Sequence, residues 1–264
     1  MSAVKDRAAN REKRMSIGAH LIELRKRLFI SAASIIVGAA LGWWLTDLFV
    51  WDAIQAPVDA VAIAQGSSSA IIFPTISSAF DLRLQVAFTL GIVISSPVWL
   101  YQIFAFLVPG LNSKERKFTF GFFATAIPLF FAGCAAGWFV LPNIVKLMTS
   151  FVPDGGESLL TAKEYIDFVL KLVVAIGIAF VVPVFIVLLN FAGVISAESI
   201  IKSWRVAILV ITLFTAIATP SADVISMFML AIPMIGLYFL AWGIAHLHDK
   251  RVAKRNQLEF GDAV

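Results

Sequence analysis

Residues 25–46, RKRLFISAASIIVGAALGWWLT, decide the fold class of this chain, because three cations precede 19 residues without any charge. A helix needs about 20 apolar residues to cross the roughly 30 Å hydrocarbon core of a bilayer. The run is longer than the apolar core of an ordinary signal peptide, and no convincing A-x-A cleavage site follows it. We therefore expect a retained membrane anchor, with Trp43 and Trp44 at its outer interface.

The rest of the chain repeats this apolar character. With 60% hydrophobic and 14% charged residues, it does not suit a water-soluble globule. We expect an all-α, polytopic membrane protein with one domain over residues 1–264. Segment 49–78 is too apolar for a loose loop, which predicts short helices on the outer face. The six predicted spans are 28–48, 80–107, 118–141, 165–191, 204–219 and 224–245.

Lysine and arginine alternate between the segments that join these spans. Residues 1–27, 109–117, 191–205 and the tail 246–264 carry 17 of them, whereas the intervening segments carry two. Because positive loops stay in the cytoplasm, both termini are expected there. The pI near 9.3 then indicates contact with anionic lipid headgroups and not with nucleic acid.

The last two spans have an unusual length. The fifth offers about 15 residues, or about 23 Å, which is shorter than the hydrocarbon core. Only residues 220–223 separate it from the sixth. A hairpin of this kind must thin the bilayer locally or pack against neighbouring helices. Prolines inside the spans add bends, which suit curved packing or a concave face; they are Pro97, Pro128, Pro183 and Pro233.

The segment before the first span, SIGAHLIELRKRL (16–28), has two helical stripes. One is apolar, and the other contains His20, Glu23 and Arg27. One interpretation is an interfacial helix with a Glu23–Arg27 pair, worth about 0.2–0.5 kcal/mol. The alternative is a binding patch in which a carboxylate lies among cations.

The loop FLVPGLNSKERK (106–117) offers a second carboxylate. Pro109 and Gly110 end the second span, and Asn112 with Glu115 has the spacing of a capping box, which alone can explain Glu115. A functional interpretation requires Glu23 and Glu115 to converge at the cytoplasmic interface. Two carboxylates there would suit a pair of guanidinium groups, because arginine binds a carboxylate through two parallel hydrogen bonds and lysine cannot.

These motifs, taken in order over residues 16–245, resemble the TatC family, the signal-peptide receptor of the twin-arginine translocase. The resemblance rests on His20-Leu21-x-Glu23-Leu24-Arg25-x-Arg27, Pro57, Pro109-Gly110-Leu111-x-x-x-Glu115-Arg116, Thr219-Pro220-x-x-Asp223 and Ala231-Ile232-Pro233.

The resemblance implies six helices in a curved, cupped-hand arrangement in a bacterial-type cell membrane. It implies that Glu23 and Glu115 bind the twin arginines of folded precursors, with Arg25, Arg27 and Phe106 in the same patch. Pro57 would belong to an outer cap and Asp223 to the link before the sixth span. Implied partners are TatA-type and TatB-type single-span subunits and further copies of the chain, with energy from the proton gradient.

Two positions depart from the family pattern, which commonly has a glutamate inside the fourth span and another in the sixth. Here the residues are Val181 and Phe239. A carboxylate in lipid is costly and usually functional, so its absence affects how polar groups of partner helices would be held. Packing alone, Asn190 or Thr125 are the candidate substitutes.

Two other function classes have weaker support. A small-solute secondary transporter would usually show repeats and ionisable groups at mid-membrane, and neither is evident. An intramembrane enzyme would need a paired nucleophile and base, and Cys134 has no candidate base near it in sequence. His246 and His248 lack a third ligand for a metal site. We therefore expect no catalysis, no cofactor and no metal.

Overall fold

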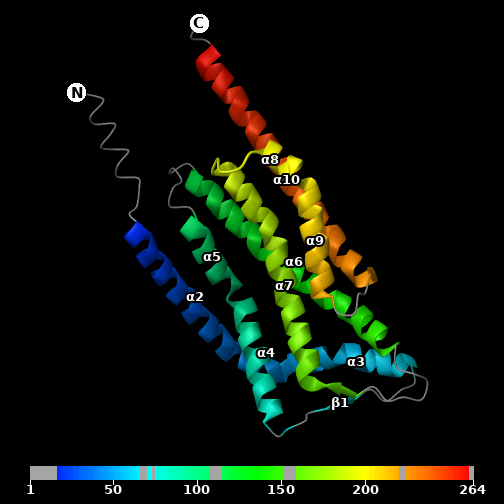
Figure 1. The fold of residues 1–264 in the computed structure, drawn as a ribbon. Coiled ribbons are helices and arrows are strands. Elements are labelled where there is room, and N and C mark those ends of the chain that lie inside the picture. Colours follow the sequence, from blue (N-terminus) through cyan, green and yellow to red (C-terminus); the bar gives the residue numbers. More distant parts are fainter. Residues whose placement is uncertain are drawn as a thin grey trace.

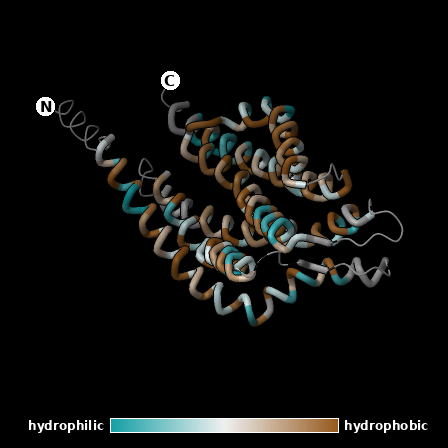
Figure 2. The backbone as a smooth tube through the Cα atoms, turned by 60° about the horizontal axis from the view of Figure 1, so that its bottom comes forward, coloured by the Kyte–Doolittle hydropathy of each residue, from teal (hydrophilic) through white to brown (hydrophobic). Residues whose placement is uncertain are grey.

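The computed structural model describes residues 17–65, 70–72, 75, 77–107, 115–150, 159–219 and 224–261. Four helical segments in these ranges are long and apolar enough to cross a membrane singly: Gly18–Leu48, Gly121–Leu147, Ala162–Phe191 and Val224–Arg255. Figure 2 shows hydrophobic residues along the length of the helices and hydrophilic residues gathered near helix ends. The chain is thus a helical, polytopic membrane protein, as the sequence predicts.

The first predicted span is helix α2 (Ile17–Leu45), which passes through a π-helical turn η1 (Thr46–Val50) into α3 (Trp51–Gln65). Helix α3 lies across one end of the molecule (Figure 1), so the helix expected in segment 49–78 is present. The same segment also contains strand β1 (Ala70–Ile72), which pairs in parallel with β2 (Leu159–Thr161). The sequence did not predict this two-stranded sheet, which pairs backbone groups of two loops that are far apart in the chain.

The second predicted span is broken. It consists of α4 (Ser78–Ile94) and α5 (Ser96–Leu107), which are bent by 54° where they meet. Pro97 follows the break and cannot donate a backbone hydrogen bond, which explains a bend at this point. The indole Nε1 of Trp99 donates to the carbonyl of Ile92 at 2.8 Å, so a side chain satisfies a carbonyl at the break.

The remaining chain forms α6 (Glu115–Thr149), α7 (Ala162–Phe191), α8 (Ala197–Lys202), α9 (Trp204–Ala218) and α10 (Val224–Gly261). Helix α9 has 15 residues, so the short fifth span is confirmed. Helix α10 continues well past the predicted end at residue 245, into the charged tail.

Helix ends segregate into two groups in Figure 1. The start of α2, the end of α5, the start of α6 and the end of α10 lie at one end of the molecule. Helix α3 and the strands lie at the other. This arrangement is the one that six alternating spans would give, while the span count and the cytoplasmic termini stay predictions.

Glycines set the closest helix contacts. A Cβ atom on Gly91 of α4 would lie 2.6 Å from the backbone nitrogen of Ala39 in α2. A Cβ atom on Gly133 of α6 would lie 2.8 Å from the carbonyl oxygen of Ile176 in α7. Small residues let membrane helices approach closely and gain van der Waals contact where the hydrophobic effect is absent. These two crossings therefore join α2 to α4 and α6 to α7.

Candidate functional site

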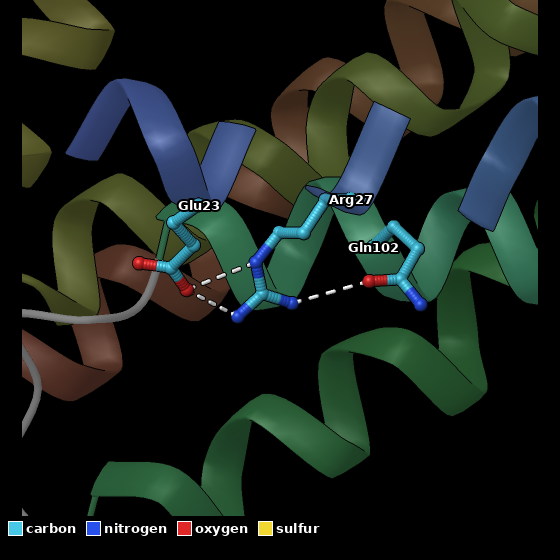
Figure 3. A network of polar contacts seen from close by, with 3 residues as sticks. All are labelled: Glu23, Arg27 and Gln102. Carbon is cyan, nitrogen blue, oxygen red and sulfur yellow. Dashed lines mark hydrogen bonds and ion pairs between the residues drawn. The ribbon is translucent and has the colours of Figure 1, made fainter. Parts of the chain in front are cut away.

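The best-defined polar cluster of the predicted binding patch lies in the first turns of α2. The Nε of Arg27 donates to Oε1 of Glu23 at 3.0 Å, and Nη2 of Arg27 donates to the same oxygen. Its third nitrogen, Nη1, donates to Oε1 of Gln102 in α5 at 3.2 Å (Figure 3). The predicted Glu23–Arg27 pair is therefore present, and Gln102 joins it to a second helix.

The second carboxylate oxygen of Glu23 is left without a partner. Oε2 is buried and has no hydrogen-bond donor in the part of the chain that the structure describes. The Glu23 side chain is 20% exposed, so the group lies at a partly covered surface. A buried carboxylate oxygen without a donor is costly. The site therefore has one acceptor that an incoming donor would satisfy.

Aromatic contact joins the same two helices one turn earlier. The rings of His20 in α2 and Phe106 in α5 stack with their centroids 4.3 Å apart and an interplanar angle of 19°. Phe106 belongs to the predicted patch, and His20 to the polar stripe of α2 that also contains Glu23 and Arg27. Arg25 is exposed and makes no ion pair among the described residues, and its position on the helix separates it from Glu23.

The convergence of Glu23 with Glu115 stays a prediction. Glu115 is the first residue of α6 and Arg116 the second, and the structure does not describe their side chains. Figure 1 places the start of α6 at the same end of the molecule as the starts of α2 and the end of α5. Four other predicted residues lie outside the described residues: Pro109, Gly110, Pro220 and Asp223.

The opposite end of the molecule holds Pro57. This residue is buried in α3, beside Val58, which is also buried. The hydroxyl of Tyr165 in α7 donates to the carbonyl of Ile54 at 2.9 Å and ties α3 to the helix bundle. The position suits the predicted outer cap.

Two ionic groups lie near this end, and both are locally paired. Arg83 of α4 forms an ion pair with Asp47, and its guanidinium carbon lies 4.3 Å from the ring centre of Trp43. Asp167 of α7 accepts a hydrogen bond from Gln85, and the amine of Lys171 lies 3.8 Å from its second oxygen. The Asp167–Lys171 pair has the i,i+4 spacing of a helix, whereas Asp47 and Arg83 lie on different helical elements and are 36 positions apart in the chain.

The two positions that lack the family's glutamates are filled by apolar packing. Val181 is 2% exposed and belongs to a cluster with Leu100, Phe104 and Phe130. Phe239 packs against Tyr238, with ring centroids 5.6 Å apart. Neither residue has a polar side chain that could bind a polar group of a partner helix.

Asn190, the first polar candidate for that role, is hydrogen-bonded within the chain through its Nδ2. It is 2% exposed, and its Nδ2 donates to Oδ1 of Asp249 and to the carbonyl of Ile195, each at 3.0 Å. The other oxygen of Asp249 accepts from the backbone nitrogen of Ala197 at 2.8 Å. This network joins α7, α8 and α10 inside the chain. Thr125 is exposed and donates to Gly121 of its own helix.

The two histidines in the second half of α10 make aromatic contacts. His248 stacks on Phe191, with centroids 3.8 Å apart, and His246 lies beside Trp242. No group of three or more histidine, cysteine or carboxylate residues is close enough to hold a metal ion within the described ranges.

Comparison with known proteins identifies the family to which this chain belongs. The family described as Sec-independent protein translocase protein (TatC) matches residues 19–233, which include Glu23, Arg27, Gln102 and Glu115. The chain belongs to the TatC family. It is therefore similar to components of a protein translocase, and this membership does not support the small-solute transporter that the sequence left open.

Curated TatC relatives match almost the whole chain. The Sec-independent protein translocase protein TatC of Xylanimonas cellulosilytica is 41% identical over 249 residues, which cover 94% of this chain and 90% of the relative. The TatC protein of Rothia mucilaginosa is 37% identical over 94% of this chain and 85% of its own length. The chloroplastic TatC of Pisum sativum is 33% identical over 86% of this chain and 63% of its own length.

Solved structures give the same result for the fold. A crystal structure of the twin-arginine translocase receptor TatC has a TM-score of 0.69 at 28% identity, and covers 86% of this chain and 98% of its own. A second structure of this receptor, in the detergent DDM, has a TM-score of 0.72 at 30% identity, over 86% and 99%. The TatC fold is therefore shown for the greater part of the chain.

Proposed function

We propose that this TatC-family chain is the signal-peptide receptor of a twin-arginine translocase. The proposal rests on the carboxylate of Glu23, of which one oxygen is hydrogen-bonded to Arg27 and the other has no donor among the described residues. The carboxylate lies partly covered at the contact of α2 and α5, and its Oε2 has no donor among the described residues. A guanidinium group would supply that donor in charge-assisted form.

Arg27 determines how a ligand arginine would bind. In the structure its guanidinium already neutralises Glu23, so the carboxylate attracts a second cation less than a free one would. A ligand arginine would first have to uncover the buried Oε2, and it could then use that oxygen while Arg27 keeps Oε1 and Gln102 holds the third arm of Arg27. Glu115 would supply the second carboxylate.

The wider proposal follows the family. The chain would be a multi-pass protein of a bacterial-type cell membrane with both termini in the cytoplasm, and it would act by recognition and assembly without covalent chemistry. Its partners would be TatA-type and TatB-type single-span subunits, other copies of the chain and anionic lipid. The proton gradient would supply the energy for transport.

The first test compares two signal peptides on the purified full chain in nanodiscs. We expect replacement of the Arg-Arg pair by Lys-Lys to weaken binding by about tenfold, because lysine keeps the charge but loses the bidentate geometry. The dissociation constant of a fluorescent peptide measures this effect. Photocrosslinkers at positions adjacent to Glu23 and Glu115, with both carboxylates kept, should capture the Arg-Arg peptide. Equal affinity for both peptides would overturn the proposal.

A second test concerns Gln102. The variant Gln102→Leu removes the acceptor that fixes Arg27 but leaves both charges in place. The bond is partly exposed, so we expect peptide affinity to fall about two- to tenfold, in line with about 0.5–1.5 kcal/mol for one hydrogen bond. Gln102→Glu supplies a carboxylate that competes with Glu23 for Arg27, and it should restore binding. If Gln102→Leu binds normally, Gln102 has no role in positioning Arg27.

A further inference from the structure

The break between α4 and α5 decides how the second predicted span meets α2. Pro97 has no N–H to donate to the carbonyl of Val93. The backbone nitrogen of Val98 donates to Ser95 at 2.8 Å and not to Ile94, so the hydrogen-bond ladder of α4 does not continue into α5. The last carbonyls of α4 thus lose their regular donors. Backbone bonds alone therefore leave the angle between the two helices weakly determined.

Trp99 bridges this break with its side chain. Its indole Nε1, on α5, donates to the carbonyl oxygen of Ile92, on α4, at 2.8 Å. The hydroxyl of Ser95 approaches the same oxygen at 3.5 Å, which is too long for a strong hydrogen bond. The indole also packs edge-on against Phe130 of α6, with ring centroids 5.4 Å apart and an interplanar angle of 87°. Trp99 thus joins both halves of the span to each other and to α6.

Ser96 offers a second way to close the same break. Its Oγ is buried and has no hydrogen-bond partner among the described residues. The hydroxyl of a helical serine can donate to the carbonyl four residues earlier, which for Ser96 is Ile92. Trp99 therefore holds the acceptor that Ser96 would use at a different bend. A chain without the indole donor can change its bend and still satisfy the carbonyl of Ile92.

The observed bend brings two residues of α5 against α2. Gln102 accepts a hydrogen bond from Nη1 of Arg27 at 3.2 Å (Figure 3), and Phe106 stacks on His20. Gln102 lies seven residues past Ser95, or about 10 Å along α5, so a change of about 20° in the bend would move it by about 3–4 Å. Such a displacement breaks a hydrogen bond. The contact with Arg27 therefore depends on the angle that Trp99 bridges.

We propose that Trp99 is a positioning residue for the receptor site. Its indole N–H fixes the bend between α4 and α5 at the angle at which Gln102 holds the third arm of Arg27. It thereby sets the orientation of the Arg27 guanidinium beside Glu23. The effect on peptide binding rests on the proposed receptor function, whereas the effect on the bend rests on the geometry of α4 and α5.

The first measurement reads the bend directly, in the full chain in nanodiscs without a signal peptide. Spin labels replace Leu84 of α4 and Ile103 of α5, which are 54% and 40% exposed, and alanine replaces the buried Cys134. The labelled positions lie about 16 Å and about 12 Å from the break, so a change of about 20° in the bend alters their separation by about 2 Å. We expect Trp99→Phe to shift the distance by about this amount and to widen its distribution. Pulsed electron paramagnetic resonance gives both values.

Two variants remove the donor, and a third serves as control. Trp99→Phe keeps an aromatic ring but loses volume, so a second variant carries benzothienylalanine at position 99, where sulfur replaces the indole N–H and the shape is retained. Both should shift the distance in the same direction. The matched control is Trp138→Phe, which removes an indole that is also half-buried but makes no hydrogen bond to α4 or α5 among the described residues. It should leave the distance unchanged.

Peptide binding then tests the consequence for the receptor site. We expect Trp99→Phe to weaken binding of the Arg-Arg signal peptide about two- to tenfold, the range for loss of the hydrogen bond between Gln102 and Arg27. In a Gln102→Leu background the same substitution should weaken binding less, because the bond that it misaligns is already absent. A general loss of stability would weaken binding equally in both backgrounds.

The proposal is overturned if removal of the donor leaves the label distance unchanged, or if Trp138→Phe shifts it as much. Equal weakening of peptide binding by Trp99→Phe with and without Gln102 would also overturn it. If Trp99→Phe fails to fold, the benzothienylalanine variant decides the outcome. Equal binding of Arg-Arg and Lys-Lys peptides by the parent chain would instead refute the receptor function, and the label distance would still show whether Trp99 sets the bend.

Discussion

Leucine in place of Gly91 is expected to separate α2 from α4 and to destabilise the protein by about 3 kcal/mol. A Cβ atom there would meet the backbone nitrogen of Ala39 at 2.6 Å and the carbonyl oxygen of Ile35 at 2.8 Å. Both are main-chain atoms, so no side-chain rotation can relieve the clash. Denaturant unfolding of the detergent-solubilised chain, followed by tryptophan fluorescence, measures the effect.

The matched control is Gly236→Leu in α10. A Cβ atom on Gly236 has no neighbour within 4 Å, so the same substitution should cost little there. An engineered cysteine pair across the contact of α2 and α4 should also form a disulfide in the parent and fail to form it in Gly91→Leu. Equal unfolding curves for the two leucine variants would show that this crossing does not hold α2 in place.

Glu23→Gln is expected to weaken binding of an Arg-Arg signal peptide about 10- to 150-fold, because a partly buried hydrogen bond to a charged group contributes about 1.5–3 kcal/mol. Glutamine keeps the size of the side chain and one acceptor oxygen but loses the charge. The same variant should bind the Lys-Lys peptide with nearly the affinity it has for Arg-Arg. Peptide titrations on the purified chain in nanodiscs give all four dissociation constants.

Glu198→Gln provides the control for Glu23→Gln. Glu198 is an exposed carboxylate of α8 on the same side of the molecule, so its loss changes the net charge equally without touching the patch. We expect it to leave binding unchanged at moderate salt, where exposed charges are screened over about 10 Å. If both variants weaken binding to the same degree, the interaction is long-range charge attraction and not a contact with Glu23.

Apolar length and charge spacing located the helices correctly. The six predicted spans all coincide with helices, and the short α9 was evident from 15 residues between Trp204 and Ala218. The sheet of β1 and β2 could not be predicted, because each strand has three residues and its partner lies almost 90 positions away. Local pattern carries no information about such a pairing.

In the candidate site too, contacts within one helix could be predicted from the sequence, whereas contacts between helices could not. The Glu23–Arg27 pair follows from helical spacing, whereas Gln102 enters only because α5 bends against α2. Asp47 and Asp249 were missed for the same reason, since their partners lie on other helices. The glycine crossings did leave a signal that the interpretation overlooked, because Gly38 with Gly42 and Gly133 with Gly137 have the G-x-x-x-G spacing of membrane helix contacts.

The continuity of α10 has a mechanical consequence. It runs from Val224 to Gly261, about 57 Å, with Asp249 fastened to Asn190 and Ala197. About 18 Å of rod extends beyond that attachment, so a tilt of about 10° would swing its tip by about 3 Å. About 38 Å of the helix lies on the other side of the Asp249 bonds, so a rotation about that attachment would move the tip only about half as far as it moves the Val224 end.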